Sequence, residues 1–425
     1  MTRASRGGPR VLVLSQCLPY PPHSGVANRT YNVLRQLSRA YDVDLLAFAR
    51  VNHQPDAAAR SAARDALAAI ASFVAEPIPV PNEQSTARRL WDHLRSLMTG
   101  RAYTYYEYDS DTFGLRLRTL LDAQRYDLVH LDSLDLHRWI PDLPNVPIAC
   151  THHNLESALL RRYAHGLSPA IVRKYVLLQA RRLEALERDI CPRLALNVMV
   201  SGLDATGLRA VAPGAVTTVV PNGTDIEYFQ PREGTVAGRI AFVGPTYSFP
   251  NRDAVEFFLD EIWTSVRRRT PQASLHLIGR NAPEDRARYG AVPGVTPLGH
   301  VADIREPLGQ ASCCVVPIRI GGGTRLKILD AWAMGKAIVS TPVGCEGLEA
   351  IDGENILVRD TPDSFAAAVS EVLRNDALRA HLEQNARRTA VDVYAWDRVG
   401  QRLHDAYDRL LGRHAAPARA PVLAQ

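Results

Sequence analysis

Residues 313–341 read CCVVPIRIGGGTRLKILDAWAMGKAIVST, and this stretch decides the fold. An apolar, β-branched run from Cys313 to Ile318 leads into three consecutive glycines. A helix-like spacing of apolar residues follows, and a second β-branched run from Ala337 to Thr341 ends the stretch. The order predicts a strand, a glycine loop, a helix and a second strand, which together make one βαβ unit.

The glycine loop of this unit has the properties of an anion site. Its glycines are Gly321, Gly322 and Gly323. Without side chains they let an anion approach the backbone, and the N-terminus of the following helix attracts negative charge. Thr324 follows directly, and Arg325 and Lys327 add two positive charges. Asp330, on a neighbouring helical position, is a candidate acceptor for hydroxyls about one turn from the phosphates. The loop thus predicts a site for a nucleotide diphosphate.

The glycine loop also allows interpretations other than a nucleotide-diphosphate site. A glycine-rich turn also occurs without a ligand, and Lys327 with Asp330 would then be an ordinary surface pair. A P-loop needs a Lys-Ser/Thr pair after its glycines, and none stands here. The G-x-G-x-x-G fingerprint is absent from this loop and from the first strand-turn, residues 11–22.

Length and composition fit a large soluble α/β enzyme. The chain has 425 residues, enough for two domains, with 46% hydrophobic and 22% charged residues. A net charge of +5 is too weak to indicate nucleic-acid binding. The six cysteines show no metal-ligand spacing, which favours a reducing, cytoplasmic environment. No segment has the length of a membrane span, and the short apolar N-terminal run lacks a signal-peptide cleavage site.

Strand and helix patterns alternate along the chain in two halves, which predicts two doubly wound parallel sheets. The expected divisions are an N-terminal domain (1–220), a linker (221–236), a C-terminal domain (237–393), a helix packing back on the N-terminal domain (394–412) and a disordered tail (413–425). Within the first domain we expect helices and a Tyr/Asp-rich loop over residues 52–125 and a long helical region over residues 155–188. Ligands of such sheets lie at the carboxyl ends of the strands, so Gly25 and the glycine loop should face each other across a cleft.

The segment between the two halves reads VPNGTD at Val220–Asp225 and is followed by Phe229. It resembles the linker of glycosyltransferase family 4, whose fold is GT-B. Further matching segments appear in order along both halves: Pro19–Gly25 with Arg29, Asp127–His130, His153–Asn154, Ser201 with Asp204, Phe242–Gly244, Gly279, Gly299–Val301, Gly321–Asp330, Val343–Gly344 with Glu346–Gly347, Gly353 with Asn355, and Tyr394 with Trp396. The resemblance implies a retaining enzyme that moves a sugar from a nucleotide-diphosphate sugar to a hydroxyl acceptor without a metal or other cofactor. The donor would lie on the C-terminal half and the acceptor on the N-terminal half.

Residue roles follow from the resemblance with two departures. The family's E-x7-E pair falls on Gly322 and Asp330, so the first acid is missing and the second is one methylene shorter. By resemblance Asp330 holds the ribose. The family's Arg and Lys after the first strand of the C-terminal half are also absent from Gly244–Asn251. We expect Arg325 and Lys327 to stabilise the leaving diphosphate instead.

Three further positions complete the expected site. By resemblance, His153 lies near the reacting carbon, with a structural histidine as the alternative. Gly25 and Gly244 are expected to allow close approach of the nucleotide sugar, although Gly25 could also serve only as a helix-entry turn.

Two further features are expected to be ordinary solvated surface. Asp109-Ser110-Asp111 imitates a D-x-D metal site but is expected to be solvated loop. A basic group occurs in the helical region 155–188: Arg161, Arg162, Arg173, Lys174, Arg181 and Arg182. It fits either a membrane-surface helix near a lipid-linked acceptor or, as the interspersed acids favour, a solvated face.

The sequence leaves the reaction partly open. A role in cell-surface polysaccharide, glycolipid or glycoconjugate assembly is expected, with the protein cytoplasmic or peripheral at the inner face of the cell membrane. A nucleotide-sugar epimerase or hydrolase, and a non-catalytic nucleotide-sugar binding protein, are the alternatives. The donor sugar and its base, the acceptor, the linkage and the oligomeric state are not readable.

Overall fold

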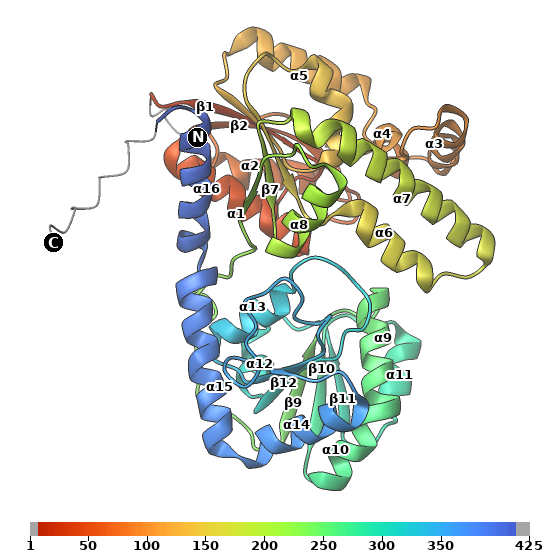
Figure 1. Ribbon diagram of the computed structural model, residues 1–425, viewed down its shortest axis with the longest axis vertical. Helices are drawn as coiled ribbons and strands as arrows, with labels where there is room; N and C mark the ends of the chain where they lie inside the picture. Colours follow the sequence, from red (N-terminus) through yellow and green to blue (C-terminus); the bar gives the residue numbers. More distant parts are fainter. Residues whose placement is uncertain (1–6, 414–425) are drawn as a thin grey trace, which may run out of the picture.

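The computed structural model describes residues 7–413, which form two α/β domains stacked along the long axis of the molecule (Figure 1). Each domain is built on one sheet, and every strand pairing in the two sheets is parallel. The predicted pair of doubly wound parallel sheets is therefore confirmed. Of the expected disordered tail, all but Arg413 lies outside the described residues.

The N-terminal sheet has the strand order β3-β2-β1-β5-β6-β7-β8, and β4 pairs with β2. Its strands are β1 (Arg10–Ser15), β2 (Asp42–Ala49), β3 (Phe73–Val74), β4 (Ile78–Pro79), β5 (Leu128–Leu131), β6 (Ile148–His152), β7 (Leu196–Met199) and β8 (Thr217–Val219). The central strands are buried along their whole length, as expected for strands covered by helices on both faces. The chain order reverses between β1 and β5, so a crevice opens at their carboxyl ends.

The C-terminal sheet has the order β11-β10-β9-β12-β13-β14. Its strands are β9 (Arg239–Val243), β10 (Ser274–Ile278), β11 (Val295–Gly299), β12 (Cys313–Val316), β13 (Ile338–Ser340) and β14 (Leu357–Val358). The order reverses between β9 and β12, and the glycine loop follows β12 at this point. The βαβ unit deduced from residues 313–341 is thus the centre of the second sheet.

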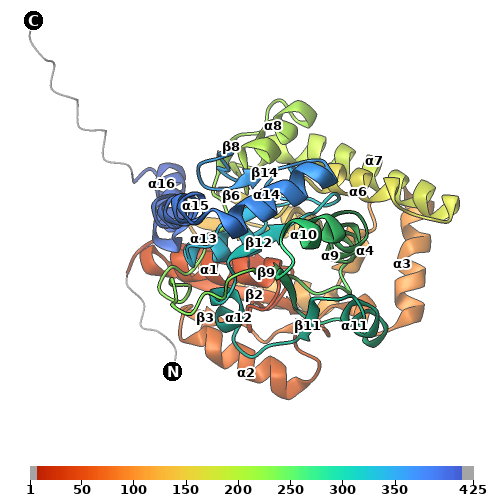
Figure 2. The same ribbon diagram turned by 90° about the horizontal axis from the view of Figure 1, so that it is seen from below.

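Helices cover both faces of each sheet (Figures 1 and 2). Those of the N-terminal domain are α1 (Gly25–Ala40), α2 (Ala57–Ala68), α3 (Thr86–Thr99), α4 (Thr104–Glu107), α5 (Asp111–Ala123), α6 (Glu156–His165), α7 (Ala170–Ile190) and α8 (Gly202–Val211). Those that follow are α9 (Phe249–Phe257), α10 (Trp263–Arg269), α11 (Pro283–Gly290), α12 (Arg305–Gly309), α13 (Leu326–Ala333), α14 (Pro362–Arg374), α15 (Asp376–Thr389) and α16 (Trp396–Leu410). No helix within residues 7–413 is long and apolar enough to cross a membrane.

The sequence interpretation was wrong in two places. Residues 52–125 are not only helix and loop, because β3 and β4 lie within them. Strands of two residues give no periodicity, and β4 contains a proline. The helical region 155–188 is broken into α6 and α7 by Gly166–Pro169, since the residue before a proline disfavours helical backbone. The strands that the sequence did not reveal (β3, β4, β11 and β14) lie at the edges of the sheets.

The last helix of the described chain belongs to the N-terminal domain. Helix α16 packs along α1, and its Trp396, Leu403 and Tyr407 are part of the hydrophobic core beneath β1 and β2. The chain leaves the C-terminal domain through α15 and a π-helical turn at Ala390–Tyr394. Figure 1 shows α15 and α16 as one nearly continuous column that joins the two domains.

The linker after β8 meets this column. Thr224 forms a β-bridge with Ala395, and its backbone N–H donates to the carbonyl of Tyr394 at 2.8 Å. Beside it, Gly223 lies against Trp396 so closely that a Cβ added at Gly223 would lie 2.7 Å from the indole. The chain passes between the domains twice, in the linker after β8 and between α15 and α16, and these two segments therefore stabilise each other.

Gly223→Ala should lower the thermal unfolding midpoint, because the added methyl group must displace Trp396 from the core. Overpacking of this kind costs about 1–3 kcal/mol, and a domain of roughly 200 residues, the size of each half of this chain, loses roughly 2–4 °C per kcal/mol. Differential scanning calorimetry measures the change. Gly202→Ala is the matched control, since a Cβ there meets nothing within 4 Å. Equal midpoints for the two variants would contradict the account of the linker.

Candidate functional site

The loops at the carboxyl ends of the two sheets face each other and bring most of the predicted residues together. Gly25 opens α1, and a Cβ there would be 3.9 Å from Leu326 of the opposite domain. Ser24 caps this helix by accepting from the backbone N–H of Ala27 at 3.2 Å. The carbonyl of His153 approaches Gly323, because a Cβ at that glycine would lie 3.4 Å from it. The walls of the cleft are therefore in contact at the glycine loop.

The glycine loop has no room for side chains. Gly323 has a φ of +70°, in the left-handed region, and a Cβ there would be 2.6 Å from Asn154 Oδ1. A Cβ at Gly322 would be 2.7 Å from Leu159 of α6. The acid that the family resemblance leads one to expect at position 322 would thus have to displace the end of the Leu159 side chain in this arrangement of the domains.

Arg325 lies under the loop and is largely buried. Its Nη1 donates to the carbonyls of Gly322 and Gly323, the second at 3.2 Å. Its Nε and Nη2 are buried with no hydrogen-bond partner among the described residues. Burial lowers the pKa of this guanidinium. Unpaired buried donors on a cation are costly, and an anion bound at the loop would supply acceptors for them.

Lys327 reaches the first strand of the same sheet. Its Nζ donates to Asn251 Oδ1 at 2.8 Å and lies 4.5 Å from the centre of the Phe242 ring. A Cβ added at Gly244, directly after β9, would lie 2.8 Å from this ammonium. Burial, followed by the charge of Arg325, lowers the pKa of Lys327 to about 7. The ammonium therefore stands at the turn where the family resemblance implies cations and this sequence has none.

Asp330 lies one helical turn further along α13. One carboxylate oxygen accepts from Thr224 Oγ1 of the linker at 2.9 Å. Burial, partly offset by this hydrogen bond, raises the pKa of Asp330 to about 7. Asp330 is half-buried, and its second carboxylate oxygen forms none of the hydrogen bonds within the described residues, so it can accept one from a ligand.

A chain of polar contacts links the loop to the N-terminal domain. Thr324 Oγ1 accepts from Asn222 Nδ2 at 2.5 Å, and Asn222 Oδ1 accepts from Arg29 Nη1 at 3.0 Å. Arg29 also donates to the carbonyl of Val220 at 2.8 Å. Its guanidinium is buried, which lowers its pKa to about 10.

The opposite wall holds His153 beside a carboxylate that the sequence analysis missed. His153 Nε2 lies 3.6 Å from Asp132 Oδ1. Asp132 follows β5 and accepts from Ser15 and Thr30, both at 2.9 Å. Burial alone would raise the pKa of Asp132, but His153 and the hydrogen bonds outweigh it, and the pKa falls below its usual value. The sequence does carry a sign of Asp132, because it is a polar residue directly after a buried strand. His153 stands in the same position after β6.

Arg162 of α6 spans the cleft, whereas the sequence analysis placed it only in the basic group of the helical region 155–188. It donates to the carbonyl of Gly321 at 3.1 Å and pairs with both carboxylate oxygens of Glu346. Behind this contact lies a cavity of about 140 Å³. It is lined by residues of both walls, among them Asn154, Arg162, Asp204, Gly322, Gly323 and Glu346.

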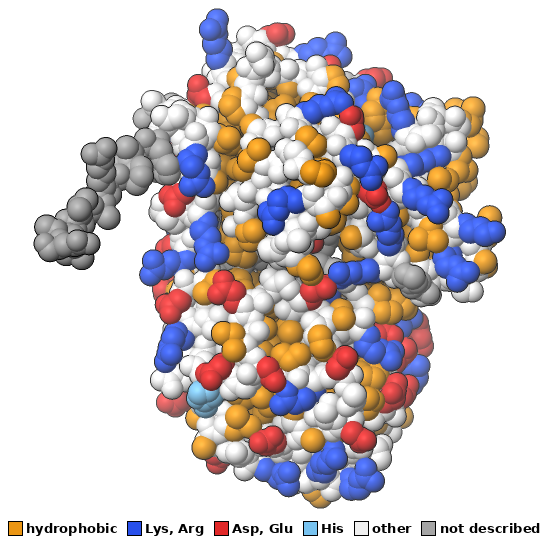
Figure 3. Space-filling model, in the orientation of Figure 1, with side chains coloured by type: hydrophobic (Ala, Val, Ile, Leu, Met, Phe, Trp, Pro, Cys, Tyr) orange, Lys and Arg blue, Asp and Glu red, His pale blue; other side chains and the backbone are white. Residues whose placement is uncertain are grey.

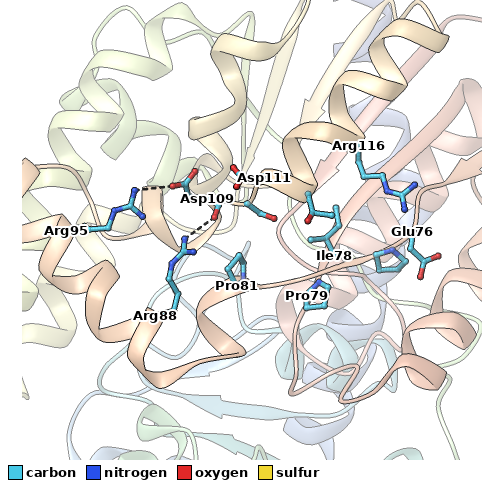
Figure 4. Close-up of a pocket in the computed structure, with 12 residues that line it drawn as sticks. Glu76, Ile78, Pro79, Pro81, Arg88, Arg95, Asp109, Asp111 and Arg116 are labelled. Atoms are coloured by element: carbon cyan, nitrogen blue, oxygen red, sulfur yellow. Dashed lines mark hydrogen bonds and ion pairs between the residues drawn. The ribbon is translucent and has the colours of Figure 1, made fainter.

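The acidic pair Asp109 and Asp111 lies elsewhere. Both line a separate cavity of about 470 Å³ between β4, α3 and α5 (Figure 4). Asp109 pairs with Arg95 at 3.3 Å and with Arg138 at 3.4 Å. No cluster of three metal-ligating side chains occurs here or elsewhere in residues 7–413.

Comparison with known proteins gives the family. Residues 23–228 match the profile of glycosyltransferase family 4, and residues 237–375 match that of glycosyl transferases group 1. Together these profiles span most of the chain, one on each domain. This chain is a family 4-like glycosyltransferase.

Its relatives agree with this assignment. The glycosyltransferase is 25% identical over 359 residues to an MMP alpha-(1->4)-mannosyltransferase of Mycolicibacterium hassiacum, a match that covers 80% of this chain and 83% of the relative. In structure it resembles sucrose-phosphate synthase of Thermosynechococcus elongatus, with a TM-score of 0.71, 16% identity and coverage of 95% and 100% of the two chains. It also resembles HepE of Anabaena in complex with UDP, with a TM-score of 0.66, 13% identity and coverage of 94% and 100%. The fold is GT-B.

Asp330→Asn should stabilise the glycosyltransferase more at about pH 8 than at about pH 5. The folded-state pKa of Asp330 is raised to about 7 from 3.8, so the folded form gains stability from protonation at low pH and loses it as the pH rises through 7. The asparagine removes this loss because it carries no charge at either pH. Thermal unfolding of both proteins at the two pH values measures the difference, and an equal change at both would show that Asp330 is not held in a desolvated site.

Proposed function

We propose that this glycosyltransferase moves a hexosyl group from a nucleotide-diphosphate sugar to a hydroxyl acceptor, with retention of the anomeric configuration and without a metal ion. The observation that carries the proposal is the pair of buried cations at the glycine loop. Lys327 reaches the turn at Gly244, while Arg325 has two unpaired donor atoms beneath Gly321–Gly323. Two desolvated cations at a helix N-terminus and a glycine loop are suited to a diphosphate.

The donor would extend along α13. The glycine loop, with Thr324 and Gly244, would receive the diphosphate, and Asp330 would accept hydrogen bonds from the ribose. The UDP complex of HepE, which shares the fold, supports a nucleotide donor. The mannosyltransferase relative supports a hexosyl group and a glycan acceptor. A role in assembling cell-surface polysaccharide, glycolipid or glycoconjugate fits these relationships.

The chemical step follows from the arrangement of charges. The bond between the anomeric carbon and the diphosphate oxygen breaks, and the acceptor oxygen bonds to the same face of that carbon. The acceptor proton passes to the departing diphosphate, whose added negative charge is stabilised by Arg325 and Lys327. These cations are already in place, so they favour the transition state over the ground state. His153, oriented by Asp132, would lie on the acceptor side and position the reacting groups.

A nucleotide-sugar panel tests the proposal. Thermal shifts with UDP-, GDP-, ADP- and dTDP-sugars should single out one nucleotide, because a ligand at a hundredfold excess over its Kd adds about 2.7 kcal/mol. Asp330→Ala should lose the shift, while the matched control Asp360→Ala, which removes an exposed acid of the same domain, should keep it.

With that donor, transfer to an added glycan or lipid-linked acceptor should yield a product whose anomeric configuration, read by proton NMR, matches the donor. Binding without transfer to any acceptor would indicate a nucleotide-sugar binding protein. Free sugar or epimer formed without acceptor would indicate a hydrolase or epimerase.

Donor affinity should fall as the pH rises above about 7. Lys327 has a pKa of about 7 in the unliganded protein, and the diphosphate favours its charged form, so each pH unit above 7 should cost up to about tenfold in affinity. Calorimetric titration of the nucleotide sugar between about pH 6 and pH 9 gives this slope. Lys327→Arg keeps the charge throughout and leaves only the contribution of Asp330, so its slope should be flatter. The same slope in both proteins would remove Lys327 from the diphosphate site.

A further inference from the structure

Helix α3 in the N-terminal domain exposes its large apolar side chains and buries polar ones. Its five large apolar side chains point to solvent: Leu90, Trp91, Leu94, Leu97 and Met98, with exposed fractions from 46% to 70%. Their spacing puts them on one stripe of the helix. The residues that α3 buries are polar, Asp92 and Ser96. A helix on a protein core normally buries the apolar stripe and exposes the polar one.

The polar face of α3 is held inward by specific bonds. Asp92 accepts from Arg88 at 2.9 Å, and Ser96 Oγ accepts from Gln179 of α7 at 2.9 Å. His93 Nδ1 lies 2.6 Å from the Tyr175 hydroxyl, also on α7. The bond between Arg88 and Asp92 lies within α3. Rotating α3 to bury its apolar stripe would break the contacts of Ser96 and His93 with α7, so these two contacts fix the outward orientation of the stripe.

The segments that carry the exposed apolar residues are rich in positive charge. Residues 85–102 and 166–175 contain one acid, Asp92, which is buried. Arg89, Arg101, Arg173 and Lys174 are exposed, and none forms an ion pair with another residue in the described range 7–413. Tyr175 holds the first turn of α7 beside α3. That turn adds two exposed apolar residues, Ile171 (72%) and Val172 (41%).

We propose that this apolar-basic face, formed by α3 and the first turn of α7, docks on the surface of an anionic lipid bilayer. Tryptophan and leucine side chains enter the boundary between headgroups and acyl chains, and arginine and lysine attract anionic headgroups. Figure 3 shows hydrophobic and basic side chains interleaved at the edge of the upper domain where Figure 1 places α3. A second copy of the chain is a poorer occupant, because a two-fold contact would bring the same cations close together.

A membrane contact through α3 would differ from one through the helical region 155–188. The interspersed acids of the helical region 155–188 favour a solvated face, whereas α3 presents an apolar stripe and its own acid, Asp92, is buried. The proposal does not rest on the transfer reaction. If both hold, the N-terminal wall of the cleft acts near a bilayer, where an acceptor anchored to lipid would be found.

Co-sedimentation with vesicles tests the proposal. The full chain should sediment with vesicles of phosphatidylcholine containing roughly one third phosphatidylglycerol, and much less with phosphatidylcholine alone. Replacing Leu90, Leu94 and Met98 together with glutamine should reduce the bound fraction about tenfold. The matched control replaces three exposed apolar residues elsewhere, Leu115, Val216 and Ile351, and should bind like the wild type.

Tryptophan fluorescence tests the proposal on the wild-type protein, so the main result does not depend on whether a variant folds. Of the five tryptophans, all within the described residues, Trp91 alone is exposed (51%), and the other four are at most 6% exposed. Its emission should shift to shorter wavelength with anionic vesicles, and Trp91→Phe should lose the shift. No wild-type sedimentation with anionic vesicles, or no loss in the α3 variant, would overturn the proposal. So would a wild-type dimer, seen by light scattering, that the same variant dissociates, because the face would then be a contact between copies.

Discussion

The buried cation Arg29 couples the N-terminal domain to the linker and, through it, to the glycine loop. Arg29 enters the linker from α1 and binds the carbonyl of Val220 and the side-chain oxygen of Asn222. Asn222 in turn holds Thr324 at the end of the glycine loop. A buried guanidinium must find acceptors, so the position of the linker is coupled to that of α1. Asn222 is therefore shared between the guanidinium of α1 and the end of the glycine loop.

The linker also reaches the donor wall and the last helices. Thr224 donates to Asp330 and pairs with Ala395, while Gly223 lies against Trp396. A movement between the domains that shifts the linker therefore acts on the predicted ribose acid and on α16 together. With Arg162 and Glu346 closing the cleft on the other side, the described arrangement is one in which the two walls are joined at several points.

The departures from the family pattern are explained by the tertiary contacts. Leu159 and Asn154 occupy the space around Gly322 and Gly323, so an acid at position 322 would have to displace the end of the Leu159 side chain. Lys327 crosses from α13 to Gly244, at the turn where the sequence lacks cations. In this chain Arg325, Lys327 and Asp330 therefore lie together on α13 and at its N-cap residue. Removing these charges from water is unfavourable, and it lowers the pKa of Lys327 and raises that of Asp330, in both cases to about 7.

The sequence by itself determined the alternation of strands and helices, the break between the halves and the glycine loop with its charges. These features are local, since a buried strand, a turn and a helix entry each leave a pattern in consecutive residues. The edge strands β3, β4, β11 and β14 left none, because they are short or contain proline. The tertiary structure alone decided the pairing of His153 with Asp132, the bridge from Arg162 to Glu346 and the outward stripe of α3. Each depends on which helix or strand packs against another, and that is a property of distant residues brought together.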